Sequence, residues 1–306
     1  GEDAAVDADV WLHDHRIAWR VFAGCAGNAH GMRTSGYACA TMSSSHAPRP
    51  PVSSITIDAV SLDILQQQHA DLRRPPASLT KLMTAYTAYD LLAQSGGSWS
   101  DTITIDPRDV HEVADDETRM GLVPGERVAL GRLLEGLMVV SGNDAALALA
   151  RHLAGSQAAF AQHMNAYART LGLHDTHFIS ASGITTAGHL STARDMAMLA
   201  AHLLARYPDL LAITAQRSFV HRTLHKANQN ALLGENGVDG LKTGYTQAAG
   251  FCLAATARRR CAGHALPLRL INVVLGADSR ASRDEQVRAQ LDAGFALAAA
   301  AEAQRV

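Results

Sequence analysis

The sequence predicts an α+β domain whose sheet combines strands from both ends of the folded region around a mostly helical middle. Apolar and β-branched runs at residues 55–60 and 64–65 indicate two strands near the start. Apolar runs at 250–257 and 268–275 indicate two more near the end. Residues 79–207, between them, have a mostly helical pattern. This order favours one antiparallel sheet in which N-terminal and C-terminal strands pair.

Helices in the middle are indicated by apolar residues at three- and four-residue spacing, over 156–171 and 192–207. Thr192 followed by Asp195 resembles a capping box with Asp in place of Glu, which marks a helix start. A last helix over 283–300 is expected to pack back on the sheet.

The folded domain is expected to begin near residue 50. Residues 1–50 are rich in Ala, Gly, Ser and His and lack sustained periodicity, and the proline-containing run at 43–51 is typical of a linker. We therefore predict a low-structure linker or targeting segment over 1–50 and one folded domain over 51–306.

Ser78 and Lys81 form the first of three motifs that carry chemistry. Pro75 and Pro76 precede the expected helix start, where a missing N–H costs nothing. Ser78 then lies in the first turn, where free N–H groups and the helix dipole favour negative charge. Lys81 lies on the same face and can take the serine proton if burial or a cation such as Lys242 makes it neutral. The alternative is an N-cap serine beside a solvated lysine.

Ser141-Gly142-Asn143 is the second motif, and it lies between apolar helical runs at 130–140 and 144–153. As a functional motif, Ser141 would relay a proton to a leaving amine and Asn143 would hydrogen-bond the substrate backbone. The alternative is an ordinary turn between two helices with an Asn cap.

Lys242-Thr243-Gly244 is the third motif, and it is expected just before the strand at 250–257. Lys242 and Thr243 would hold a carboxylate, and Gly244 would remove side-chain bulk where the substrate backbone lies along the sheet edge. The alternative is a lysine at the start of an edge strand.

The three motifs together describe the serine site of class A β-lactamases and penicillin-binding proteins. Their long separations along the chain fit groups that converge from different elements. The chain resembles the low-molecular-mass penicillin-binding proteins that are D-alanyl-D-alanine carboxypeptidases. Segments that carry the resemblance are 74–84, 141–146, 164–165, 176–178, 191–197 and 228–230.

The resemblance implies a β-lactamase/transpeptidase-like fold and makes residues 51–306 a penicillin-binding serine carboxypeptidase domain. It implies no cofactor and no metal. The implied roles are a nucleophile at Ser78, a proton acceptor at Lys81, a second motif of Ser141 and Asn143, a carboxylate clamp of Lys242 and Thr243 beside Gly244, and an oxyanion hole from the backbone N–H groups of Ser78 and Tyr245.

The reaction implied is removal of the terminal D-alanine from peptidoglycan stem pentapeptides through an acyl-enzyme, with β-lactam antibiotics as covalent inhibitors. The alternatives are a β-lactamase or a D,D-endopeptidase on the same fold, or a non-catalytic penicillin-recognising protein. Gly142 is similar to the carboxypeptidase pattern, whereas class A β-lactamases more often have Asp there. The only glutamate between Ser141 and Lys242 is Glu235, and no Asn stands four residues after it as in the deacylation loop of those β-lactamases.

Two departures from the family pattern concern the substrate pocket. Ser182 stands where some members carry His. Residues 277–279 stand where some members carry an arginine that helps hold the terminal carboxylate, and Arg280 and Arg283 follow slightly later. Which arginine, if any, completes the carboxylate site is therefore open.

Composition excludes several other classes. The 306 residues are 47% apolar and 18% charged, which is typical of a globular enzyme and not of bulk disorder. The net charge of −2 provides no electrostatic footprint for nucleic acid. The basic run at 258–260 is expected at an exposed hairpin tip, and Cys252 in the core. No Cys or His spacing indicates a metal.

An enzyme acting on cell-wall peptides must work outside the cytoplasm, so a periplasmic or secreted location is expected. No clean export signal is visible, because the apolar run at 16–23 is too short and too charged. No stretch of 18 apolar residues is present, so no transmembrane helix is predicted.

Overall fold

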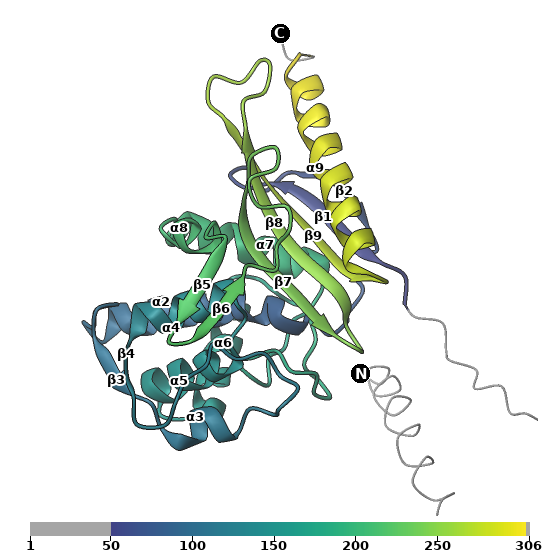
Figure 1. The fold of residues 1–306 in the computed structure, drawn as a ribbon. Helices are drawn as coiled ribbons and strands as arrows, with labels where there is room; N and C mark the ends of the chain where they lie inside the picture. The colour runs from purple at the N-terminus through teal and green to yellow at the C-terminus, as the bar shows by residue number, and fades with distance from the viewer. Residues whose placement is uncertain (1–49, 304–306) are drawn as a thin grey trace, which may run out of the picture. The chain divides into compact units, whose positions relative to one another are not determined.

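The computed structural model describes residues 50–303, so the predicted linker segment over 1–50 lies outside the described residues except for Pro50. The strands of the main sheet are β1 (Ser53–Asp58), β2 (Ile64–Gln68), β7 (Val238–Thr246), β8 (Gly250–Arg259) and β9 (Leu268–Ala277). They form an antiparallel sheet in the order β2-β1-β9-β8-β7 (Figure 1). Strand β1 pairs with β9, so the predicted union of N-terminal and C-terminal strands is confirmed.

The sheet is buried on both faces, which explains the continuous apolar runs of β8 and β9. Ile271 and Val273 of β9 belong to a core shared with the helical region. Leu270 and Val274 belong to a second core on the opposite face. Because side chains alternate between the two faces of a strand, a strand covered on both sides needs apolar residues at every position.

One long helix covers each face of the sheet. Helix α9 (Arg280–Ala303) contributes Leu291 and Phe295 to the second core, and α7 (Ala193–Arg206) packs on the opposite face against β1, β8 and β9 (Figure 1). The predicted last helix is therefore confirmed. It begins at Arg280 rather than at residue 283.

The other helices are α2 (Lys81–Gln94), α3 (Pro107–His111), α4 (Leu130–Val139), α5 (Asn143–Ala154), α6 (Gln157–Thr170) and α8 (Leu210–Thr214). Helix α2 is buried over most of its length and contacts α4, α5, α6 and α7, so it is the centre of the helical region. A helix surrounded by others needs small and apolar residues on all sides rather than one apolar stripe. Among residues 50–303, none of the helices could cross a membrane.

The third motif lies inside β7, not just before a strand as predicted. Strand β7 begins at Val238 and ends at Thr246, and residues 242–244 pair with β8. Gly240 and Gly244 lower the strand propensity of this segment, and for this reason the sequence pattern does not reveal β7 as a strand. The pairing with β8 is a tertiary contact that the local sequence does not record.

Two short antiparallel strand pairs were not predicted. They are β3 (Thr102–Thr104) with β4 (Arg127–Ala129), and β5 (Ser218–His221) with β6 (Leu224–Ala227). Strands of three or four residues are too short for an alternating pattern to be recognised.

Only half of the predicted capping box at α7 is present. The Thr192 hydroxyl accepts a hydrogen bond from Asp195 N at 3.0 Å. The Asp195 carboxylate instead accepts from Asp175 N at 2.9 Å and from the Thr176 hydroxyl at 2.6 Å. In a full capping box the Asp195 carboxylate would accept from Thr192 N. It accepts from Asp175 and Thr176 instead, and so it ties the segment before α7 to the helix start.

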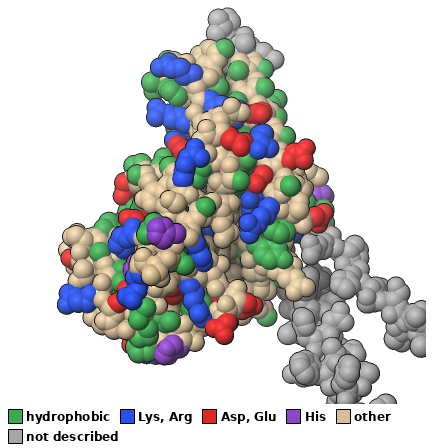
Figure 2. Space-filling view, viewed as in Figure 1, with side chains coloured by type: hydrophobic (Ala, Val, Ile, Leu, Met, Phe, Trp, Pro, Cys, Tyr) green, Lys and Arg blue, Asp and Glu red, His purple; other side chains and the backbone are tan. Residues whose placement is uncertain are grey.

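The basic run lies at the end of β8, next to the predicted hairpin tip, and Arg258 and Arg259 still pair with β9. Arg258 and Arg260 are exposed, and basic side chains gather over this end of the molecule (Figure 2). Cys252 of β8 is fully buried, which confirms its expected core position.

Candidate active site

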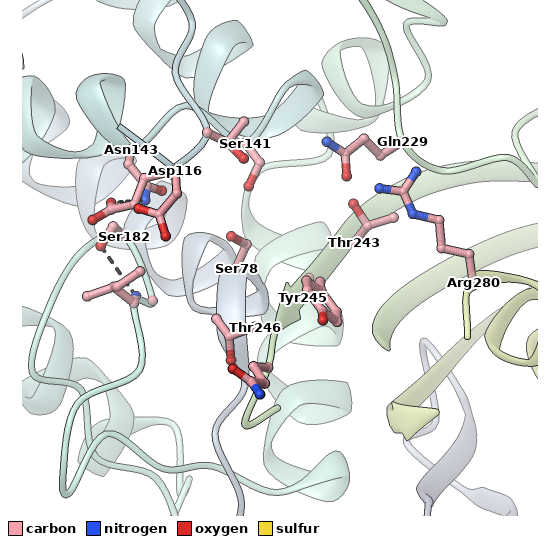
Figure 3. Close-up of a pocket in the computed structure, with 16 residues that line it drawn as sticks. Ser78, Asp116, Ser141, Asn143, Ser182, Gln229, Thr243, Tyr245, Thr246 and Arg280 are labelled. Carbon is pink, nitrogen blue, oxygen red and sulfur yellow. Dashed lines mark hydrogen bonds between the residues drawn. The ribbon is translucent and has the colours of Figure 1, made fainter. Parts of the chain in front are cut away.

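A cavity of about 390 Å³ lies between the helical region and the edge strand β7. All three motifs contribute to its wall: Ser78 from the first, Ser141 and Asn143 from the second, and Thr243 and Gly244 from the third (Figure 3). The sequence-predicted residues that do not line it are Lys81 and Lys242. Further lining residues are Asp116, Glu117, Thr118, Ser182, Gly183, Ile184, Gln229, Tyr245, Thr246, Gln247 and Arg280.

Ser78 lies in a 3₁₀ turn, η1 (Ala77–Thr80), that leads directly into α2 at Lys81. Ala77 has φ of +49°, an uncommon conformation for a residue with a side chain. Such conformations persist only where the surroundings hold them, and they concentrate at functional sites. Here the conformation turns Ser78 toward the cavity at the start of the helix.

Lys81 is completely buried and has three polar neighbours. Its Nζ lies 3.0 Å from Ser78 Oγ, 2.6 Å from Asn143 Oδ1 and 2.7 Å from the Ser182 carbonyl oxygen. A neutral amine has two hydrogens and one lone pair. The two carbonyl oxygens accept the two hydrogens, so the lone pair remains for the Ser78 hydroxyl.

The pKa of Lys81 is well below its ordinary value. Burial is the largest cause, because it penalises the charged amine, and the nearby charge of Lys242 lowers the pKa further. Glu117 and Asp144 act in the opposite direction. Lys242 is thus a cation that lowers the pKa of Lys81, as the sequence suggests, and burial acts in the same direction.

The second motif joins α4 to α5. Ser141 has φ of +64° and lines the cavity, and its hydroxyl forms no hydrogen bond with another described residue. Asn143 begins α5. Its Oδ1 accepts from Lys81, and its Nδ2 donates to the carboxylate of Glu117. The motif is therefore joined to the first one through Asn143, while Ser141 is left facing the cavity.

Residues of strand β7 differ in whether they reach the cavity. Thr243 and Tyr245 line the cavity, whereas Lys242 is buried and donates to the Thr243 carbonyl oxygen at 2.9 Å. Burial and the charge of Arg283 lower the pKa of Lys242 to about 7. Lys242 thus acts on the site as a buried charge behind the cavity wall.

A side chain at Gly244 would crowd the protein's own η1 turn. A Cβ at this position would lie 3.0 Å from Leu79 Cδ1 and 3.1 Å from Ser78 N. The sequence-based reason, room for a substrate backbone, is therefore incomplete, because the η1 turn already occupies this space. The same approach places the backbone of Ser78 next to the strand that carries Tyr245.

Arg280 is the arginine at the cavity. It is exposed, lines the wall and forms no ion pair with another described residue. Its guanidinium lies on the same side as Thr243 and Gln229 (Figure 3). Arg283 is buried and paired with Asp284 at 2.7 Å. Of the two arginines left open by the sequence, only Arg280 faces the cavity.

Sequence reasoning missed the acidic side of the cavity. Asp116 lies opposite Arg280 (Figure 3), and Glu117 lines the cavity as well; both belong to the loop between α3 and β4. The class A β-lactamase pattern predicts a carboxylate only between the second and third motifs, and Glu235 from that region does not line the cavity. The available signal was the acidic run at 115–117. Within residues 50–303, no group of three His, Cys, Asp or Glu side chains is placed to hold a metal ion.

Comparison with known proteins identifies the family. The family model for D-alanyl-D-alanine carboxypeptidase matches residues 42–279. D-alanyl-D-alanine carboxypeptidase DacA of Escherichia coli is 37% identical over 247 residues, which are 79% of this chain and 60% of the relative. The chain thus spans about 60% of the length of the curated relatives it first matches.

Solved structures agree with the predicted transpeptidase-like fold. Penicillin binding protein 5 of Haemophilus influenzae is 34% identical with a TM-score of 0.76, over 81% of this chain and 72% of that one. Penicillin-Binding Protein D2 of Listeria monocytogenes, in a cefotaxime-bound form, is 30% identical with a TM-score of 0.69, over 79% of this chain and 96% of that one. The family model covers most of the chain and DacA is 37% identical over the aligned residues, and so the chain belongs to the D-alanyl-D-alanine carboxypeptidase family.

Proposed function

We propose that this chain is a serine-type D-alanyl-D-alanine carboxypeptidase that removes the terminal D-alanine from peptidoglycan stem pentapeptides. The observation that carries the proposal is the environment of Lys81. Its Nζ has carbonyl acceptors at Asn143 and Ser182 and the hydroxyl of Ser78 as the third neighbour. This arrangement supports proton transfer from Ser78 to Lys81 during attack.

In the acylation step, Ser78 Oγ attacks the carbonyl carbon of the penultimate D-alanine and its proton moves to Lys81 Nζ. The tetrahedral oxyanion is stabilised by the backbone N–H groups of Ser78 and Tyr245. One such donor contributes about 3–4 kcal/mol in other acyl-transfer enzymes. The close approach of Ser78 N to Gly244, the neighbour of Tyr245, supports a shared position for the two donors.

Collapse of the intermediate breaks the C–N bond, and D-alanine leaves after its amine takes a proton. Ser141, whose hydroxyl is free on the cavity wall, relays that proton from Lys81. Water then attacks the acyl-Ser78 ester, gives its proton to Lys81 and releases the shortened peptide. As the ester C–O bond breaks, Ser78 Oγ takes that proton from Lys81, so one complete cycle returns Ser78 and Lys81 to their starting protonation states.

The terminal carboxylate of the substrate binds at the basic side of the cavity. The Thr243 hydroxyl and the Arg280 guanidinium are the groups that reach it, and Lys242 adds charge from behind the wall. Arg280 is unpaired among the described residues, so it can form a charge-assisted contact without breaking another. Asn143 holds the peptide backbone of the substrate with its free amide hydrogen.

β-lactams are proposed to acylate the same serine. Support comes from the Listeria monocytogenes relative, whose structures have cefotaxime-bound and ampicillin-bound forms. Because the substrate belongs to the cell wall, we place the enzyme outside the cytoplasm, in the periplasm or secreted.

The test is product analysis on a pentapeptide ending in D-alanyl-D-alanine, together with intact-mass analysis after penicillin treatment. We expect release of one D-alanine, and an adduct on Ser78 that Ser78→Ala abolishes without loss of fold. An adduct on another serine would overturn the site. Penicillin hydrolysis without an accumulating adduct would instead indicate a β-lactamase.

A further inference from the structure

Glu117 contacts the second motif in a way that the proposed mechanism does not use. It lines the cavity, and its carboxylate accepts a hydrogen bond from Asn143 Nδ2. The neighbouring Thr118 carbonyl oxygen accepts from Asn143 N at 2.8 Å. Asn143 is thus held to this loop through its side chain and through its backbone.

The loop itself is anchored firmly. The carboxylate of Asp144 accepts three backbone hydrogen bonds from it: from Met120 at 2.8 Å, and from Gly121 and Leu122 at 3.0 Å each. Asp144 is completely buried. Because Asp144 follows Asn143 directly, these hydrogen bonds hold the loop that carries Glu117 against the start of α5, where Asn143 lies.

The orientation of the Asn143 amide matters for Lys81. A side-chain amide has an accepting oxygen and a donating nitrogen of nearly the same size, so it can be turned by half a revolution at little steric cost. With the oxygen toward Lys81, the amine donates to it and its lone pair stays available to Ser78. With the nitrogen toward Lys81, the amide would compete with the Ser78 hydroxyl for that lone pair.

An ionised glutamate only accepts hydrogen bonds, so it selects one of the two amide orientations. We propose that Glu117 is a positioning residue for acylation, which holds the Asn143 amide oxygen toward Lys81 and thereby leaves the Lys81 lone pair for Ser78. This inference rests on the proposed function, because it concerns the same serine and lysine.

Glu117 also acts on Lys81 through its charge. It favours the charged amine, as Asp144 of α5 does, whereas Lys242 of β7 opposes it. His189, from the segment before α7, lies near Lys81 as well. Removing the Glu117 charge should therefore lower the pKa of Lys81, because the other groups are unchanged.

The test compares Glu117→Ala and Glu117→Gln by the rate of Ser78 acylation with benzylpenicillin, followed by intact mass as a function of pH. Glu117→Ala loses the acceptor, and we expect acylation roughly 10- to 100-fold slower, the effect of losing a hydrogen bond to a charged group. Glu117→Gln keeps an acceptor oxygen, so its plateau rate should recover most of the loss. Its rate should reach the plateau at lower pH than the wild type, a shift that a merely structural role would not cause.

The matched control is Asp115→Ala on the same loop, which removes an exposed charge and a 3.6 Å ion pair with Arg119 but does not touch Asn143. It should acylate like the wild type. Equal acylation by Glu117→Ala and wild type would overturn the inference, and a longer acyl-enzyme lifetime alone would assign Glu117 to deacylation instead. Absence of any Ser78 adduct in the wild type would overturn the proposed function itself, so the two failures are distinguishable.

Discussion

The backbone carbonyl oxygen of Ser182 accepts a 2.7 Å hydrogen bond from Lys81 Nζ. A backbone acceptor can be supplied by any residue type, so the departure from His at this position does not remove it. What positions the carbonyl is the next residue, Gly183, which has φ of +84° and packs directly against the η1 turn. A Cβ there would lie 2.1 Å from the Ala77 carbonyl oxygen.

Gly183→Ala should therefore destabilise the protein and slow acylation. The left-handed conformation costs a residue with a side chain about 1–2 kcal/mol, and overpacking against a backbone atom adds about 1–3 kcal/mol. Gly188→Ala is the matched control, because Gly188 has φ of +82° but open space around its Cβ position. Gly188→Ala should lose only the stability that corresponds to the cost of the left-handed conformation. Urea unfolding and penicillin labelling of both variants measure the difference, and equal losses would show that the contact with η1 carries no cost.

Lys242 should make substrate discrimination depend on pH. Its pKa of about 7 means that its charge is present below pH 7 and is lost as the pH rises through that value. A substrate with a free terminal carboxylate should react faster than its amide at pH 6, by roughly one to two decades in kcat/KM. The ratio should shrink above pH 7, because Lys242 becomes neutral. Measuring kcat/KM for both substrates between pH 6 and 8.5 checks this, and a ratio of one throughout would exclude a carboxylate clamp.

Arg280→Ala should impair the free acid but not the amide. The guanidinium contributes a charge-assisted hydrogen bond to the carboxylate, and we expect kcat/KM to fall roughly 10-fold or more. Arg288→Ala is the control from the same helix, since Arg288 pairs with Glu235 at 2.9 Å. Steady-state kinetics on the two substrates separate the cases. An equal fall for acid and amide would show that Arg280 does not bind the carboxylate.

His189 should make stability depend on pH. Its Nδ1 accepts from Ile179 N at 3.0 Å, so its Nε2 carries the hydrogen and donates to the Thr80 hydroxyl at 2.8 Å. Burial, with the charges of His177 and Lys81, lowers the pKa of His189 to about 4 from 6.5. Between these values the unfolded chain binds a proton that the folded chain does not. The contribution is complete above pH 6.5 and is lost as the pH falls toward 4, by about 3 kcal/mol.

The measurement is the free energy of unfolding at several pH values between 4 and 7.5. His189→Gln should be less stable at pH 7 and should show a shallower decline toward pH 4 than the wild type. His163→Gln, at an exposed position of α6, is the control and should keep the decline of the wild type. An unchanged decline in His189→Gln would show that other groups cause it.

Strands β8 and β9 were predictable because they are long and buried on both faces. The run at 268–275 is apolar at nearly every position. Its short length and its β-branched residues favour a buried strand over a helix. The boundary of β7 was not predictable, since Gly240 and Gly244 weaken the local signal and pairing with β8 supplies the missing stability. The four short strands β3, β4, β5 and β6 fall below the length at which a period can be recognised.

By itself, the sequence determined that strands from both ends of the folded region form one sheet around a helical middle, and it determined the chemistry of the three motifs. Ser78 and Lys81 are neighbours on one turn, so local geometry alone brings them together. The partners of Lys81 were decided only by the tertiary structure, because Asn143 and the Ser182 carbonyl come from distant segments. The same holds for Glu117, Arg280 and the burial of Lys242 behind the cavity wall. Contacts between segments far apart in the chain leave no periodic or compositional trace, whereas spacing within one helical turn does.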